Sequence, residues 1–149
     1  MTSRSHTGGV VAVAGPAGVG KNSIIDGVIK RCPNCADLIT ATTRMPRANE
    51  KHGVDYFFFT LPEFEKHVAA RNIPEVHVHP NGAHYGTFLP YLKEQLQKGR
   101  VVLGDITLSG AQYLKDTHHA LTIFIEPPSF EILEKRIHDR KTGMSDDEL

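Results

Sequence analysis

The fold is decided by one stretch, Gly15-Pro16-Ala17-Gly18-Val19-Gly20-Lys21, which directly follows the apolar run Val10 to Ala14. The apolar run is typical of a buried parallel strand, and the residues up to about Arg31 place isoleucine and valine at helical spacing. Glycines let the backbone curl so that successive N–H groups point at one centre. A helix begins there with the positive end of its dipole, and Lys21 adds a charge. The pattern therefore indicates a loop that binds a polyphosphate.

The position after the lysine departs from the usual form of this loop, in which a Ser or Thr hydroxyl ligates magnesium. Asn22 stands there, and the hydroxyl comes one residue later, at Ser23. An amide oxygen can ligate magnesium, but it is bulkier and neutral. The candidate phosphate-binding residues are Gly15, Pro16, Ala17, Gly18, Val19, Gly20, Lys21, Asn22 and Ser23.

The composition is that of one soluble globular domain of 149 residues, with 40% apolar and 23% charged residues. Positive and negative side chains balance, so no global field favours nucleic acid or a membrane as a partner. No apolar run approaches the roughly 20 residues that span a bilayer. We interpret the polar start, Met1 to Gly9, as a flexible leader and expect a cytoplasmic protein. Monomer and homodimer both stay open.

Strands and helices are predicted to alternate, which favours an α/β fold with a parallel sheet covered by helices on both faces. After the first helix we expect strands at 38–42, 56–59, 75–79, 84–87, 101–106 and 121–125, the last two buried. We expect helices at about 61–70, opened by a Thr60–Glu63 capping box, and at 90–98, 110–115 and 129–140. The short, half-polar strands of residues 39–87 suggest a small mixed lobe inserted into the core.

Two groups of residues that could ligate a metal are not interpreted as metal sites. The pair Cys32 and Cys35 follows the first helix and has no second C-x-x-C to complete a zinc site, so we take it as incidental. His77 and His79 share a strand face with Glu75, and we favour a solvated hairpin face over a metal site.

A second cluster, Thr42-Thr43-Arg44-Met45-Pro46-Arg47, places two guanidinium groups in one loop, a pairing that suits a grip on phosphate. With the glycine loop, this cluster resembles the guanylate kinase family. The resemblance continues through Glu50, Gly53, Asp55-Tyr56-Phe57-Phe58, Tyr85-Gly86-Thr87, Gly110-Ala111, Ile123-Phe124-Ile125-Glu126-Pro127-Pro128 and Leu133-Glu134-Lys135-Arg136. The matching stretches run in family order over about Val10 to Arg140.

The resemblance implies a P-loop kinase with an ATP-binding core (9–38 and 88–139), a GMP-binding lobe (39–87) and a partial lid (140–149). It implies phosphoryl transfer from MgATP to GMP, catalysed by Lys21, Arg44, Arg136 and Arg140. The GMP-binding residues would be Thr40, Arg44, Arg47, Glu50, Tyr56, Glu75, Tyr85 and Thr87. Magnesium would be held by Asn22 and by Asp105, which ends the apolar strand as a Walker-B-like carboxylate does. The acceptor is already an ionised phosphate, so the reaction needs no general base.

The chain departs from the family at Thr107 and Ser109, where an acid and a glutamine are usual. Ser145-Asp146-Asp147-Glu148 has the form of a helix start, so we interpret the chain as truncated at its C-terminus, which predicts exposed pairing elements and lower stability. Two alternatives stay open. One is a related kinase acting on a ribose bisphosphate, which Asn22 favours, and the other is a weakly active module that binds phosphopeptides.

Overall fold

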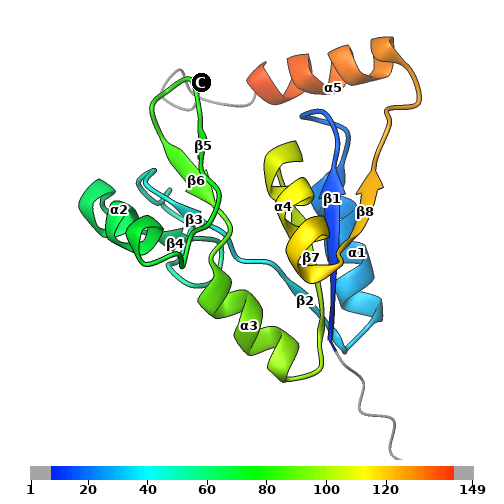
Figure 1. Ribbon diagram of the computed structural model, residues 1–149. Helices are drawn as coiled ribbons and strands as arrows, with labels where there is room; N and C mark the ends of the chain where they lie inside the picture. Colours follow the sequence, from blue (N-terminus) through cyan, green and yellow to red (C-terminus); the bar gives the residue numbers. More distant parts are fainter. Residues whose placement is uncertain (1–7, 143–149) are drawn as a thin grey trace, which may run out of the picture.

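The structure is a computed structural model that describes residues 8–142, in which strands and helices alternate along the chain (Figure 1). The strands are β1 (Gly9–Ala14), β2 (Cys35–Asp37), β3 (Ala41–Thr42), β4 (Phe57–Phe58), β5 (His77–Val78), β6 (His84–Gly86), β7 (Val101–Asp105) and β8 (Leu121–Phe124). The helices are α1 (Lys21–Arg31), α2 (Leu61–Ala69), α3 (Leu89–Gln97), α4 (Leu108–His118) and α5 (Phe130–Thr142).

The core sheet has the strand order β2-β7-β1-β8, with every pairing parallel, as the sequence predicts. Alternate residues of β1 face opposite sides of this sheet. Val10 and Ala12 pack in one cluster with residues of α3 and α4, and Val13 packs against Ile25 of α1 on the other side. The central strand is therefore held between helices, with the carboxyl ends of β1 and β7 at one edge of the sheet.

The second sheet is small and mixed, with the order β4-β3-β6-β5 and one parallel pair, β3 with β4. Its own core joins Phe64 of α2, 1% exposed, to Ala41 and Ile73. The predicted capping box is confirmed. The Thr60 hydroxyl accepts from the backbone N–H of Glu63, while the Glu63 carboxylate accepts from the N–H of Thr60. The second sheet thus packs on a separate cluster beside the core sheet (Figure 1).

The prediction of a single strand at 38–42 is wrong, because the segment divides between the two sheets. The N–H of Leu38 donates to the carbonyl of Leu103 and continues the edge of β2 along β7. The carbonyl of Thr40 then accepts from Phe57, and β3 begins at Ala41 in the second sheet. The apolar residues of this segment indicate that it is buried in both sheets. They do not indicate that the segment leaves β7 and pairs with strands of the second sheet.

The strand predicted at 121–125 is confirmed as β8, but the prediction that it is buried is wrong. All four residues of β8 are exposed, with Leu121 at 62% and Phe124 at 58%. β8 lies at the edge of the core sheet, pairs with β1 on one side, and is little covered by the described part of the chain.

The helix predicted at 110–115 is correct in type but extends over Leu108–His118, because Thr107 caps its N-terminus by accepting from the N–H of Gly110.

Some predictions lie outside the described residues. They are the leader, apart from Gly8 and Gly9, and the helix start at Ser145. Of the lid at 140–149, the structure describes only the backbone of the last turn of α5. The division into core, lobe and lid stays a prediction. Within residues 8–142, no helix is long and apolar enough to cross a membrane.

Candidate functional site

The glycine loop joins the carboxyl end of β1 to the first turn of α1, as the sequence predicts. Gly18 and Gly20 have φ values of 79° and 101°, a conformation that residues with a Cβ rarely adopt. A Cβ on Gly18 would also lie 3.1 Å from Cγ1 of Ile137, so α5 packs directly over the loop. The N-cap residue of α1 is Gly20, which has no side chain to cap the helix. The N–H groups of its first turn can therefore donate hydrogen bonds to an anionic ligand, which the helix dipole also attracts.

Lys21 lies folded back over this loop. Its Nζ donates to the carbonyls of Gly15 at 2.8 Å and Pro16 at 3.1 Å, and lies 3.7 Å from Oδ1 of Asp105. Burial raises the pKa of the Asp105 carboxyl, and the nearby ammonium partly offsets that effect. The side chains of Asn22 and Ser23 are exposed in the first turn of α1. The loop therefore gathers one cation, one carboxylate and two neutral polar side chains at the carboxyl edge of the core sheet.

The second sheet contributes an arginine held by a glutamate. Nη1 and Nη2 of Arg44 each donate to one oxygen of Glu50 at 2.8 Å, and Glu50 also accepts from the N–H of Arg47 at 2.8 Å. The hydrogen bonds from Arg44 are the main reason that the pKa of Glu50 is lowered, and the same pairing raises the pKa of Arg44. The Arg47 side chain is exposed. Glu50 thus orients the arginine and positions its loop.

Two tyrosines lie beside Arg44. The guanidinium carbon lies 5.5 Å from the centroid of the Tyr56 ring, whose own centroid is 6.1 Å from that of Tyr85. Burial raises the pKa of Tyr56, so its hydroxyl stays protonated near neutral pH and can donate a hydrogen bond. Arg44 follows β3, Tyr56 precedes β4 and Tyr85 lies in β6. Their guanidinium and two phenol hydroxyls form a group suited to a phosphate monoester.

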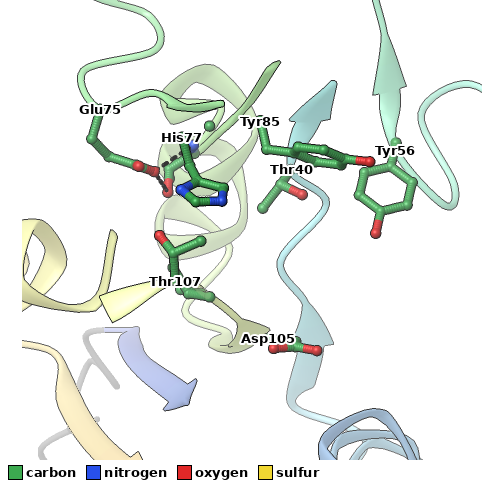
Figure 2. A pocket seen from close by; sticks show the side chains of 10 residues that line it. Thr40, Tyr56, Glu75, His77, Tyr85, Asp105 and Thr107 are labelled. Atoms are coloured by element: carbon green, nitrogen blue, oxygen red, sulfur yellow. Dashed lines mark hydrogen bonds between the residues drawn. The ribbon is translucent and has the colours of Figure 1, made fainter. Parts of the chain in front are cut away.

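A pocket lies between the two sheets (Figure 2). It brings together six predicted site residues: Thr40, Tyr56, Glu75, Tyr85, Thr87 and Asp105. Asp105 also lies next to Lys21, so the glycine loop and the pocket share one wall. Figure 2 shows Glu75 on one side of the pocket and the two tyrosines on the other. The arrangement suits an elongated ligand with a polar ring at one end and a phosphate at the other.

Glu75 is held firmly in this pocket. Its Oε1 accepts from the backbone N–H and from the hydroxyl of Thr87, both at 2.8 Å. Burial raises the pKa of the carboxyl, and the hydrogen bonds from Thr87 counteract part of the rise. A Cβ on Gly110 would lie 3.2 Å from Oε1 and 2.4 Å from Cγ2 of Ile106, so α4 can approach the glutamate this closely only with glycine there.

The pocket is also lined by four residues that the sequence analysis did not place in the site, and two of these, His77 and Thr107, have polar side chains. We expected His77 on a solvated hairpin face, and its side chain is exposed, but it lines the pocket (Figure 2). The spacing of two residues from Glu75 was a usable signal, because alternate residues of a strand share a face. His79 is exposed and is absent from the pocket lining.

Helix α5 reaches the glycine loop through Arg136. Nη1 of Arg136 donates to the carbonyl of Val19 at 3.2 Å, which joins residues 117 positions apart in the sequence. The side chain of Arg140 lies outside the described residues. Within residues 8–142, no cluster of three or more His, Cys, Asp or Glu side chains could hold a metal ion, and both cysteines are free.

Comparison with known proteins agrees with this geometry. The sequence profile of the family described as guanylate kinase matches residues 8–147, almost the whole chain. The chain belongs to the guanylate kinase family. It is 37% identical to the guanylate kinase of Rhodopirellula baltica over 93% of this chain and 68% of that protein. It is 39% identical to the guanylate kinase of Carboxydothermus hydrogenoformans over 97% and 70% of the two chains.

A solved structure supports the same assignment for the fold. The crystal structure of guanylate kinase from Anaplasma phagocytophilum superposes with a TM-score of 0.67 at 29% identity, and the match covers 87% of this chain. The fold is thus the mixed α/β guanylate kinase fold, with a parallel sheet flanked by helices. The chain spans 66% of that solved chain and about 70% of the curated relatives named above.

Proposed function

We propose that the protein transfers the terminal phosphoryl group of ATP to GMP, giving ADP and GDP. The observation that carries the proposal is that the glycine loop and the pocket, two candidate sites for phosphate, share one wall. Asp105 contacts Lys21 of the glycine loop and lines the pocket that holds Glu75 and both tyrosines. A donor phosphate on the loop and an acceptor phosphate beside Tyr56 and Tyr85 would meet at this wall. Membership in the guanylate kinase family supports the same reaction.

On the donor side, residues 15–23 and the first turn of α1 bind the ATP phosphates. Lys21 leaves its contacts with the carbonyls of Gly15 and Pro16 and neutralises the phosphate oxygens. The oxygens of Asn22 and Asp105 are hard ligands on exposed or half-exposed side chains, and they fit Mg²⁺. When bound, the ion supplies charge neutralisation on the phosphates.

On the acceptor side, Arg44, Arg47, Tyr56 and Tyr85 hold the GMP phosphate, with Glu50 orienting the arginine. Glu75 accepts from the N1–H and 2-amino donors of guanine, a pair of donors that adenine lacks, and Thr40 and Thr87 contribute hydroxyls at the same pocket. Arg136 approaches from α5, and its charge and that of Arg140 stabilise the transferring group. Positioning and charge account for the catalysis, since the acceptor phosphate needs no base.

The test is ADP formation from MgATP with GMP, dGMP, AMP or ribose 1,5-bisphosphate as the acceptor. We expect turnover with GMP and a loss of at least about 100-fold in Lys21→Ala, because the loop cation acts on the developing charge. Lys30→Ala is the matched control, since Lys30 lies exposed in the last turn of the same helix.

Each other outcome assigns a different function. Turnover only with ribose 1,5-bisphosphate would replace the acceptor, an outcome for which Asn22 gives the one specific reason. GMP binding measured by calorimetry without ADP formation would indicate a binding module. Absence of both GMP binding and GMP turnover in folded protein would refute the proposal.

A further inference from the structure

We propose that His77 is a specificity-determining residue, whose imidazole accepts a hydrogen bond from the 2-amino group of the guanine base. The inference rests on the proposed function and adds a residue to it. Its basis is the register of the hairpin. His77 pairs with Tyr85 across β5 and β6, and directly paired residues of an antiparallel ladder project from the same face. That face is the pocket wall.

His77 lies at the end of the pocket where the proposed function places the guanine base. Figure 2 shows its ring beside the Glu75 carboxylate and the Thr107 side chain, on the side away from Tyr56. Within residues 8–142, the His77 ring makes no hydrogen bond. A ring nitrogen in this pocket thus keeps its hydrogen-bonding capacity for a ligand.

The donors of guanine outnumber the acceptors that Glu75 still offers. Guanine presents one N1–H and two amino hydrogens on this edge, whereas Oε1 of Glu75 already accepts two hydrogen bonds from Thr87. The Thr107 hydroxyl is engaged as well. It accepts from the N–H of Gly110 at 3.2 Å to cap α4, and it lies 3.1 Å from the Ser109 hydroxyl. An amino hydrogen buried without an acceptor would cost binding free energy. His77 supplies that acceptor.

The experiment compares GMP with IMP, which lacks only the 2-amino group, by isothermal titration calorimetry on the full chain. In His77→Ala we expect GMP binding about five- to tenfold weaker, the value of one hydrogen bond, and IMP binding changed by less than about twofold. His77→Asn keeps an acceptor and should recover part of the loss. Val78→Ala is the matched control, because Val78 is the adjacent residue of the same strand and projects from its opposite face.

The outcomes separate this inference from the function on which it rests. Equal weakening of GMP and IMP in His77→Ala, or no change in either, would overturn the role of His77 and leave the GMP site intact. Wild-type protein that is folded by circular dichroism but binds neither nucleotide would overturn the proposed acceptor and the inference together.

Discussion

At the scale of single residues, the environment of Glu75 has a measurable consequence. Its pKa is raised above that of an ordinary glutamate, chiefly because the carboxyl is buried between the two sheets. The ionised form is the one that accepts hydrogen bonds at both oxygens, since a protonated carboxyl turns one oxygen into a donor. GMP binding therefore requires the pH to stay above this raised pKa.

We predict that GMP affinity falls on acidification at a higher pH than an ordinary glutamate would require. As the pH falls through the raised pKa, Glu75 takes up a proton and loses an acceptor. Glu75→Gln should bind GMP about tenfold more weakly at neutral pH, the value of a hydrogen bond to a charged group. The variant should also lack the loss of GMP affinity that protonation of Glu75 causes in the wild type.

The measurement is the dissociation constant of GMP across the acidic range, for wild type and Glu75→Gln in parallel. The phosphate of GMP itself titrates near pH 6, so the difference between the two profiles isolates Glu75. Glu65→Gln on the exposed face of α2 is the control. Parallel profiles for wild type and Glu75→Gln would contradict the prediction.

At the scale of elements, burial separates two leucines that the sequence treats alike. Leu114 of α4 is 0% exposed and belongs to the main core cluster, whereas Leu121 of β8 is 62% exposed. Both lie in segments where apolar residues predict burial. Only α4 has the core sheet and α3 to pack against, so only Leu114 gains the full stabilisation from removal of apolar surface from water.

We predict that Leu114→Ala lowers the free energy of unfolding by about 2–5 kcal/mol, because it leaves a cavity in a packed core. The same truncation at Leu121 should cost less than about 1 kcal/mol, since the side chain is already largely in water. Urea denaturation followed by circular dichroism measures both. A cost at Leu121 as large as that at Leu114 would mean that β8 is covered in solution.

At the scale of the whole molecule, α5 connects the end of the described chain to the loop near its beginning. Leu133 and Ile137 approach Gly18, and Arg136 donates to the carbonyl of Val19. The second sheet lies beside the core sheet (Figure 1), and residues from the ends of both sheets line the pocket. Phosphoryl transfer then depends on three segments that are remote in sequence and adjacent in space.

We predict that Arg136→Ala lowers kcat by about 100-fold or more, since it removes a charge that acts on the transferring group, and changes GMP affinity by less than about twofold. Arg136→Lys keeps the charge and should recover part of the rate. The neighbouring exposed Lys135→Ala is the control. Loss of GMP affinity with kcat unchanged would instead assign Arg136 to acceptor binding.

The sequence by itself determined the local structures and the chemistry they carry. The strand, loop and helix from β1 to α1 follow from an apolar run, glycines with positive φ and a helical stripe. The capping box at Thr60 follows from a contact over three residues. These features depend on neighbours in the chain, so residue type and spacing are enough to specify them.

Only the tertiary structure decided which segments meet. It divided residues 38–42 between two sheets, left β8 exposed at an edge, and turned His77 toward Glu75 and the pocket. The physical reason is that strand pairing, strand order and the closure of a pocket depend on hydrogen bonds and packing between residues far apart in sequence. Apolar periodicity records that a face is buried, and it does not identify the partner that buries it.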